Sequence, residues 1–350
     1  MVGHGWSSSV IVTHGLQCAV MNALEFLVPC GLVPAGFAAT LVADLRLPCL
    51  GLFASLGHAR PAPDLNAHPL STPDEAWVLR HTPATNLALL WFDSLGHSPG
   101  EFAAARWMLE PAHFQVGTSQ VVLADPAHLQ LEAGESTELA EAARPILAEA
   151  GWQLVAATPE RWFLGHSAPI DLGGPSIGCA IGRDLAAFLP KGAPEWERRW
   201  RQTLNDIQMT WYAHPVNATR EATGRAPVNV LWLSGNGTLS LDALPYSQLV
   251  SDAPLWSQAR VAGGSHASLE TFEGLSGPAR SEDWTSWREA LLACEARLSV
   301  RIGQLRAGTL DEITLVLTDQ DRLRATRLAR STLWQFWRRG QTSELLTAPA

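Results

Sequence analysis

Short apolar runs alternate with amphipathic segments along this chain, and this alternation limits its fold more than any other feature. Runs at 24–28, 228–233 and 313–317 have the length of buried strands. Residues 195–212 and 281–305 instead carry large apolar side chains at spacings of three and four, as amphipathic helices do. Strands that alternate with helices predict an α/β fold with a central, mainly parallel sheet flanked by helices.

Three further segments complete the predicted architecture. Within residues 107–131, Gly117-Thr-Ser119 separates two β-rich runs, which predicts an inserted β-hairpin region. Residues 323–339 are predicted to form a helix close to the end of the sequence. Residues 57–75 hold several prolines and few apolar side chains, so they are predicted to be a loop.

Composition excludes several classes of protein. Hydrophobic residues make up 47% of the chain and charged residues 17%, which indicates a packed core rather than disorder. The formal net charge of −9 argues against a general nucleic-acid binder, although the arginines of residues 301–350 leave a local contact with nucleic acid or protein open. The five cysteines are scattered and form no CxxC pair, so we expect reduced thiols rather than a disulfide framework or a structural zinc site.

The longest apolar stretch, residues 20–42, does not have the features of a membrane span. It contains Glu25 and is interrupted by Pro29 and Pro34, and no Lys or Arg precedes Arg46 as a secretory signal would require. We therefore expect a cytoplasmic protein with no membrane partner.

The predicted domain organisation is simple. Residues 1–20 differ in composition from the rest of the chain and are predicted to be a disordered extension. Residues 21–345 are predicted to form a single α/β unit, with one half at 21–190 and the other at 191–345.

The densest signal lies in residues 205–237, which are predicted to form a helix, a tight turn, a short helix, a strand and a glycine loop. Pro215 holds His214 in an extended conformation. Asn217 is then placed to cap the short helix, and Gly224 to end it in a left-handed conformation. Arg220 would lie in the first turn of that helix, where a guanidinium beside free backbone N–H groups can bind an anion.

The next strand ends in a glycine-rich loop. Asn229 is a polar residue in an apolar strand and needs hydrogen-bond partners if it is buried. In open α/β sheets, ligands bind beyond the carboxyl ends of the strands, and glycines there let the backbone approach a ligand closely. From the residues alone, a purely structural role for each of these side chains stays equally open. The candidate ligand-binding residues are His214, Asn217, Arg220, Asn229, Ser234, Gly235 and Gly237.

This segment closely resembles the signature of the RpfE-type regulatory protein family. The matching elements are His214-Pro-Val-Asn217-Ala-Thr-Arg220, Gly224, Pro227-Val-Asn229 and Trp232-Leu-Ser-Gly235-Asn-Gly237. Flanking pieces such as Asp125-Pro126, Pro159-Glu-Arg161-Trp162 and Gly182-Arg183-Asp184 are similar too, so that the resemblance spans roughly residues 21–340. The block 214–237 also resembles archaeal-type cofactor-independent phosphoglycerate mutases, which belong to the alkaline-phosphatase-like superfamily.

The mutase resemblance implies an alkaline-phosphatase-like fold, two divalent metals and a Ser or Thr nucleophile. It also implies Asp-Gly after the first strand and Asp-His after a late strand as metal ligands. This sequence instead has Pro29-Cys30-Gly31 and Thr318-Asp319-Gln320-Asp321 at those places. Asp319 and Asp321 remain as weak metal candidates, and Ser55 and Thr72 as candidate nucleophiles. No cofactor is expected, with Mn²⁺ or Mg²⁺ required only if the chain is an active mutase.

The sequence therefore predicts a non-catalytic regulatory or ligand-binding protein that recognises a small phosphorylated or anionic ligand. In this hypothesis Arg220 pairs with the anion, Asn217 and Asn229 donate hydrogen bonds to it, and the glycines admit it. One alternative is an active metal-dependent mutase or phosphoesterase. A second is a protein-interaction module without a small ligand, whose partner the sequence does not identify.

Overall fold

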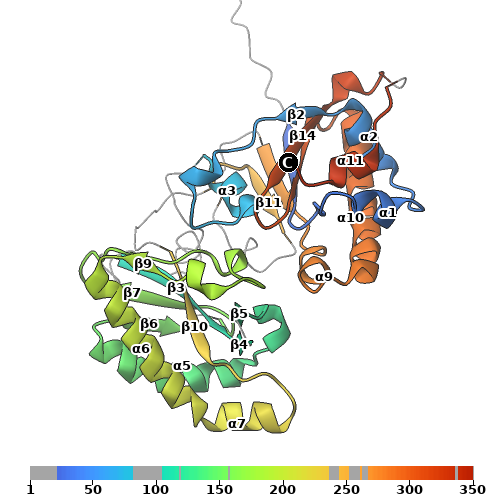
Figure 1. Cartoon of the computed structure of the whole chain (residues 1–350). Coiled ribbons are helices and arrows are strands. Elements are labelled where there is room, and N and C mark those ends of the chain that lie inside the picture. Colours follow the sequence, from blue (N-terminus) through green and yellow to red (C-terminus); the bar gives the residue numbers. More distant parts are fainter. Residues whose placement is uncertain are drawn as a thin grey trace, which may run out of the picture.

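The computed structural model describes residues 22–81, 105–117, 120–156, 158–235, 244–251, 261, 267–335 and 338–349. The predictions for residues 1–20 and for Gly237 fall outside these residues. Two separate sheets organise the described chain, each with its own helices (Figure 1). We call lobe A the part formed by residues 22–81 and 244–349, and lobe B the part formed by residues 105–235.

Lobe A is built on a six-stranded sheet with the strand order β11-β12-β1-β13-β14-β2. The first four strands are parallel, whereas β14 and β2 are antiparallel to their neighbours. This result confirms a mixed α/β protein with a mainly parallel central sheet. The strands are β1 (Ala23–Val28), β2 (His58–Arg60), β11 (Gln248–Val250), β12 (Ala267–Thr271), β13 (Glu312–Thr318) and β14 (Leu323–Ala329).

Helices cover both faces of this sheet, which explains why its central strands β1 and β13 are almost wholly buried. On one face, Phe26 and Leu315 pack against a helical layer that includes the long helix α10. On the other face, Leu27 and Val316 pack against α3 (Pro73–Leu79) and also against side chains of lobe B. The helices of the first layer are α1 (Ala38–Val42), α2 (Pro48–Leu56), α9 (Ser276–Arg280), α10 (Trp284–Ala307) and α11 (Thr342–Leu346).

Lobe B is built on a four-stranded antiparallel sheet with the order β10-β3-β7-β6. One face packs against α5 and α6 through a core that contains four fully buried tryptophans, Trp107, Trp162, Trp200 and Trp211. The short helix α7 (Pro215–Ala222) follows α6. The elements are β3 (Ala105–Ala112), α5 (Ala133–Glu149), β6 (Gln153–Ala156), β7 (Trp162–His166), α6 (Pro194–Tyr212) and β10 (Val230–Ser234).

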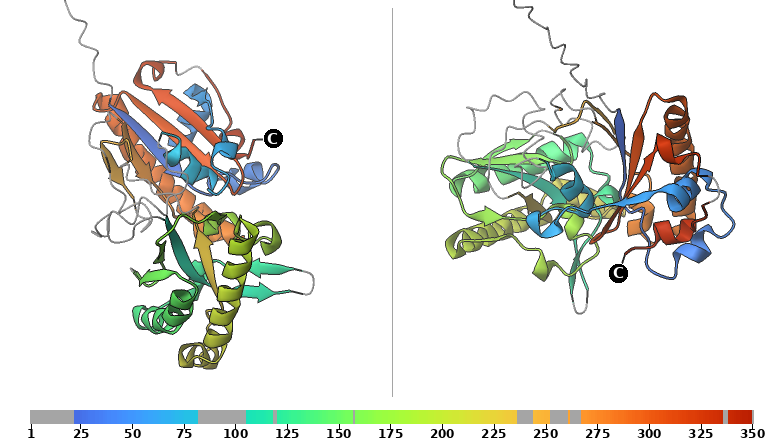
Figure 2. Two further views of the ribbon diagram at one scale, coloured as in Figure 1. Left: turned by 90° about the vertical axis from the view of Figure 1, so that its left-hand side faces the viewer. Right: turned by 90° about the horizontal axis from the view of Figure 1, so that it is seen from above.

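Two short strands next to this sheet project away from lobe B (Figure 2). They are β4 (Phe114–Val116) and β5 (Val121–Leu123), which pair antiparallel. A second small pair consists of β8 (Leu172–Gly173) and β9 (Lys191–Gly192). Single-turn 3₁₀ helices at Leu65–Ala67, Pro126–Leu129, Ile177–Cys179, Leu185–Ala187 and Arg330–Thr332 fill the remaining connections.

The structure differs from the sequence predictions in several elements. The loop predicted over residues 57–75 contains β2 (His58–Arg60), a 3₁₀ helix (Leu65–Ala67) and the start of α3 at Pro73. The helix predicted over 323–339 is wrong, because residues 323–329 form β14 and pair along their whole length with β13. The long helix α10 begins at Trp284 rather than at residue 281, and it is capped by Asp283, whose side chain accepts from the backbone N–H of Ser286. The four-stranded sheet of lobe B is formed within residues 105–235.

None of the helices in the described part of the chain combines the length and apolar composition that crossing a bilayer requires.

Candidate functional site

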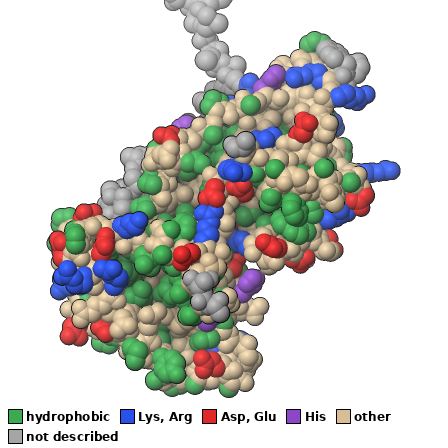
Figure 3. All heavy atoms as spheres, in the orientation of Figure 1, with side chains coloured by type: hydrophobic (Ala, Val, Ile, Leu, Met, Phe, Trp, Pro, Cys, Tyr) green, Lys and Arg blue, Asp and Glu red, His purple; other side chains and the backbone are tan. Residues whose placement is uncertain are grey.

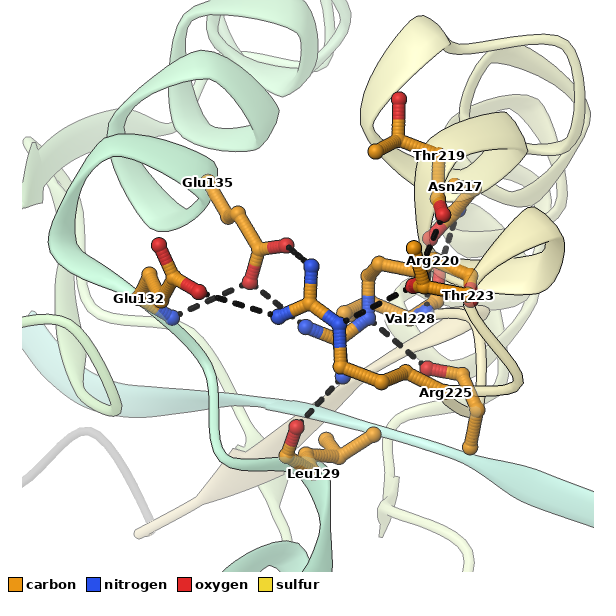
Figure 4. Close-up of polar contacts among 10 residues, drawn as sticks. Leu129, Glu132, Glu135, Asn217, Thr219, Arg220, Thr223, Arg225 and Val228 are labelled. Carbon is orange, nitrogen blue, oxygen red and sulfur yellow. Dashed lines mark hydrogen bonds and ion pairs between the residues drawn. The ribbon is translucent and has the colours of Figure 1, made fainter.

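Arg220, the residue predicted to bind an anion, lies fully buried in lobe B (Figure 4). Its Nη1 atom lies 2.6 Å from Oε2 of Glu135 on α5, and its Nε donates to the carbonyl of Ala226 at 2.8 Å. Its Nη2 donates to the carbonyl of Leu129. The guanidinium thus joins α7, α5 and the turn before α5, with all three nitrogens bonded to protein atoms. An anion could reach it only after these contacts had broken.

Asn217 lies inside α7, so its predicted role as the helix cap is wrong. The cap is His214, whose Nδ1 accepts from the backbone N–H of Val216 at 3.3 Å. The Asn217 amide accepts from the backbone N–H of Val228 at 2.8 Å and donates to the carbonyls of Trp211 and Val228. It therefore holds the end of α6 against the segment that leads into β10. Gly224 has a φ of +74°, which confirms the predicted left-handed helix stop.

The other predicted residues, Asn229, Ser234 and Gly235, lie at the two ends of β10 and form hydrogen bonds with neighbouring segments. The Asn229 amide accepts from the backbone N–H of Phe114 at 2.7 Å and donates to the carbonyl of the same residue at 3.1 Å. The Ser234 hydroxyl donates to the carbonyl of Pro175 at 3.3 Å, and the backbone of Gly235 pairs with Gly174. The structure does not gather these residues around one cavity, so a ligand-binding role for them stays a prediction.

A pocket of about 460 Å³ lies between the two lobes, and we call it the inter-lobe pocket. It lies beyond the carboxyl ends of the parallel strands β1, β12 and β13, which is where ligands bind in open α/β sheets. In the space-filling view, acidic and basic side chains lie together across the middle of the molecule, where the lobes meet (Figure 3). Both lobes contribute polar side chains to the lining of the inter-lobe pocket. They are Cys30, Thr72, Asp74, Glu75, Glu273, Ser276, Arg280, Asp319 and Gln320 from lobe A, and Glu110, Asp125, Gln130, Glu160, Arg161 and Ser176 from lobe B.

Three carboxyl groups of this pocket have raised pKa values. Glu75 is buried at the start of α3, where its Oε2 accepts from the backbone N–H of Thr72 at 3.0 Å and from the Ser176 hydroxyl at 2.5 Å. Burial, followed by the charge of Asp74, raises the pKa of Glu75 to about 8. Burial also raises the pKa of Asp74 and of Glu110. These carboxyls therefore hold protons more readily than exposed ones do.

Two arginines reach the same pocket from different lobes. Arg280, at the end of α9 in lobe A, donates through Nη1 to Oδ2 of Asp125 in lobe B at 3.3 Å. Arg161, which precedes β7 in lobe B, has its Nε 3.5 Å from Oε1 of Glu110. Both separations exceed the 2.7–2.9 Å of a tight charge-assisted hydrogen bond. The pocket therefore combines two cations, one from each lobe, with carboxyls that can carry protons.

The positions that depart from the mutase pattern both lie at this pocket. Cys30 follows β1, and burial raises the pKa of its thiol to about 11, so the thiol is protonated at neutral pH. Asp319 follows β13, and its Oδ1 accepts from the backbone N–H groups of Asp321 and Arg322. Within the described ranges, no three His, Cys, Asp or Glu side chains are placed to hold a metal ion together. Cys30, Asp319 and their described neighbours therefore do not fit a two-metal centre.

The remaining sequence candidates separate in the structure. Thr72 lines the inter-lobe pocket, whereas Ser55 lies on α2 and its hydroxyl oxygen accepts from the backbone N–H of Gly340. Asp321 lies outside this pocket and pairs with Arg183 at 2.6 Å.

Sequence reasoning did not identify Glu75, Glu110 and Arg280 as site residues. The signal for Glu110 was present, because a single carboxylate directly after the apolar run Trp107-Met-Leu109 is as unusual as Asn229 before its strand.

The sheets and the pocket between them define a two-lobed mixed α/β protein with one mainly parallel and one antiparallel sheet. No protein-family model and no curated protein sequence matches the chain. Among solved structures, the chain is similar to the PH0037 protein from Pyrococcus horikoshii, with a TM-score of 0.50 and 10% identity over 93% of this chain and 92% of that one. It is also similar to the cofactor-independent phosphoglycerate mutase from Thermoplasma acidophilum, with a TM-score of 0.41 and 13% identity over 94% of this chain and 95% of that one. The likeness to the Pyrococcus protein concerns the fold alone.

Proposed function

We propose that this protein binds a small anionic, phosphate-bearing molecule in the inter-lobe pocket, and that it acts as a regulatory ligand-binding protein rather than as a phosphoryl-transfer enzyme. The observation that carries the proposal is the pair of arginines, Arg161 and Arg280, that enters this pocket from opposite lobes. A ligand held by both would be bonded to both lobes at once.

Arg280 is the better placed of the two donors. In the described chain its guanidinium makes a single hydrogen bond, the 3.3 Å contact with Asp125. A guanidinium has five N–H groups, so the others can donate to a ligand oxygen. Planar, two-point donation to a phosphate or carboxylate is the geometry for which arginine is best suited.

The charge of the pocket sets a condition on this proposal. Seven carboxyl groups line it against two arginines, and seven ionised groups would repel an anion. The count includes Asp74, Glu75, Glu110, Asp125, Glu160, Glu273 and Asp319. With a pKa of about 8, Glu75 is mostly protonated at pH 7, and a protonated carboxyl can donate a hydrogen bond to a ligand oxygen. We therefore expect tighter anion binding at pH 6.5 than at pH 8.5.

Further arguments support this proposal over its alternatives. The resemblance to RpfE-type proteins favours a regulatory role. Cys30 and Gln320 stand where the mutase pattern requires an aspartate and a histidine, which weighs against two-metal phosphoryl transfer. The inter-lobe pocket is also a better place for an anion than Arg220, whose nitrogens are all bonded within the protein.

The test is a calorimetric titration with 3-phosphoglycerate at pH 6.5. We expect binding to the wild-type chain and a roughly 10- to 100-fold loss of affinity in Arg280→Gln, because a hydrogen bond to a charged group contributes about 1.5–3 kcal/mol. The matched control is Arg288→Gln, which removes an arginine that pairs with Asp44 at 2.8 Å on the surface of α10. This variant should bind as the wild type does.

A coupled assay for 2-phosphoglycerate, with Mn²⁺ added, completes the experiment. We expect no turnover from folded protein. Turnover that EDTA abolishes would overturn the non-catalytic role. Equal affinity of the wild type and Arg280→Gln would show that the anion binds elsewhere.

A further inference from the structure

A second pocket, of about 370 Å³, lies behind one wall of the inter-lobe pocket, and we call it the side pocket. The wall consists of residues 70–75 from lobe A and 175–179 from lobe B, which are joined by a 2.7 Å hydrogen bond from the backbone N–H of Ser176 to the carbonyl of Leu70. Ser71 and Pro73 line the side pocket, whereas Thr72 and Asp74 line the inter-lobe pocket. The two pockets therefore lie on either side of the same two segments, and Gln320 borders both.

The body of the side pocket is apolar. Lobe A contributes prolines and leucines from the segment before α3, and lobe B contributes Phe188 and Leu189 from the segment before β9. A volume of this size with apolar walls and a few polar groups is typical of a small-molecule site. The apolar lining is Leu65, Pro69, Leu70, Pro73, Pro175, Ala187, Phe188 and Leu189.

The charged groups of the side pocket carry a net positive charge. They are Arg183, Lys191 and Asp321, and the Cys179 thiol is neutral because burial raises its pKa. Asp321 pairs with Arg183 at 2.6 Å. In the described chain, Lys191 makes no ion pair or hydrogen bond through its side chain. One cation is thus left uncompensated in a protein whose formal charge is −9.

The identity of that cation is unusual for this chain. The sequence contains 25 Lys and Arg residues, and Lys191 is its only lysine. Lysine is a compact point charge on a flexible stem, whereas arginine is the residue for fixed ion pairs. The other cation, Arg183, has its Cζ 5.7 Å from the centre of the Phe188 ring, so it borders the apolar wall as well as Asp321.

We infer that the side pocket binds a small amphipathic anion, with an aromatic or short acyl body against Phe188 and Leu189 and its negative group beside Lys191. The apolar walls favour a ligand with an apolar body, because binding removes its apolar surface from water. The uncompensated charge of Lys191 favours a negatively charged ligand, because it attracts an anion at the rim of the pocket and repels a cation. The site is distinct from the inter-lobe pocket and does not depend on the function proposed for that pocket.

The single lysine makes a direct test available. Reductive methylation with ¹³C-formaldehyde labels Lys191 and the chain's amino terminus, keeps the lysine charge, and yields few signals in an NMR spectrum. The full-length protein is then titrated with three probes of matched shape: 2-naphthalenesulfonate, 2-naphthylmethanol and 2-naphthylmethylamine. We expect the sulfonate to shift the Lys191 signal saturably and to bind at least about tenfold more tightly than the amine.

Variants assign the binding energy to each part of the pocket. Lys191→Met, measured by calorimetry on unlabelled protein, should weaken the sulfonate several-fold and leave the neutral alcohol unchanged. Phe188→Ala should weaken both. Arg199→Met is the matched control, because Arg199 lies on α6, 5.3 Å from the Trp196 ring and outside the side pocket. Arg280→Gln should also leave sulfonate binding unchanged, which separates this site from the inter-lobe pocket.

Three outcomes would overturn the inference: no saturable binding of the sulfonate, equal affinity for the sulfonate and the amine, or saturable binding with an unshifted Lys191 signal. The third outcome would place the sulfonate on an apolar surface elsewhere.

Discussion

The carboxyl of Glu75 accepts a hydrogen bond from the Ser176 hydroxyl at 2.5 Å, so a buried acid of lobe A is bonded directly to lobe B. The same oxygen accepts from the backbone N–H of Thr72 and closes the capping box of α3. One side chain therefore serves the helix cap, the contact between the lobes and the inter-lobe pocket.

The raised pKa of Glu75 predicts that stability falls as pH rises. The pKa is about 8 in the folded chain and 4.5 for an ordinary glutamate, so between these values the folded state binds more protons than the unfolded state. The free energy of unfolding should therefore decrease from about pH 4.5 to pH 8 and level off above it. Urea unfolding followed by tryptophan fluorescence at pH 5, 6.5 and 8 measures this slope.

The variant Glu75→Gln isolates the contribution of this group. A glutamine can still accept from Thr72 but has no charge to desolvate. The urea midpoint of Glu75→Gln should therefore rise relative to that of the wild type as pH rises. Glu138→Gln, at an exposed position of α5, should follow the wild type at every pH. Parallel slopes for the wild type and Glu75→Gln would contradict the assignment.

Arg220 is predicted to act on stability. Removal of one partner of a buried ion pair costs about 3–5 kcal/mol, and we expect this loss for Arg220→Ala in equilibrium urea unfolding. Arg225 offers a matched control, because it pairs with the same Glu135 at 2.8 Å while 31% of its side chain is exposed. Arg225→Ala should cost about 0–1 kcal/mol. If Arg220→Ala were as stable as Arg225→Ala yet lost 3-phosphoglycerate binding, Arg220 would be a ligand residue after all.

Asn229 is predicted to hold β4 against lobe B. Its side-chain amide is hydrogen-bonded to both the N–H and the carbonyl of Phe114. Asn229→Ala removes both of these hydrogen bonds. We expect a loss of about 1–3 kcal/mol and faster amide hydrogen exchange at Phe114. Asn205→Ala, at an exposed position of α6, should stay within about 0.5 kcal/mol of the wild type. Unchanged exchange at Phe114 would show that β4 is held by other contacts.

Cys30 is predicted to be slow to alkylate. Its pKa of about 11, against 9.0 for an ordinary thiol, lowers the thiolate fraction at pH 8 about 100-fold. Arg280 lowers this pKa in part, so Arg280→Gln should slow the reaction further. Mass spectrometry of iodoacetamide-treated protein, with the urea-unfolded chain as reference, gives the rate at this residue. Equal rates in the folded and unfolded chains would show that burial does not control the thiol.

The fold was predictable wherever a segment carried a strong apolar pattern. The stripe of α6 and the runs of β1 and β13 are strong enough to identify these elements without tertiary context. The segment of β14 is different, because its Leu, Arg and Ala residues all favour helices. Seven consecutive pairs with β13, from Glu312 opposite Ala329 to Thr318 opposite Leu323, override that local preference.

The site predicted from the sequence and the site proposed from the structure rest on the same rule applied to different strands. Ligands bind at the carboxyl ends of parallel strands, and the sequence analysis applied this rule to β10. The structure places β10 in the antiparallel sheet of lobe B, where neighbouring strands end on opposite sides. Applied to β1, β12 and β13, the same rule leads to Cys30, Glu273 and Asp319 at the inter-lobe pocket. Sequence alone does not assign a strand to one of two sheets.

The insertion of lobe B within lobe A has a consequence for the order in which the protein is made. β1 precedes lobe B in the sequence and leaves the ribosome before it, whereas its two neighbours, β12 and β13, are synthesised only after all of lobe B. The four strands of the lobe B sheet lie within residues 105–235, so that sheet can form while lobe A is still incomplete. Phe26, Leu27 and Val28, which are fully buried in the finished protein, are meanwhile without their partners. β1 is therefore synthesised before lobe B but paired only after it, and its apolar side chains are exposed to aggregation during that interval.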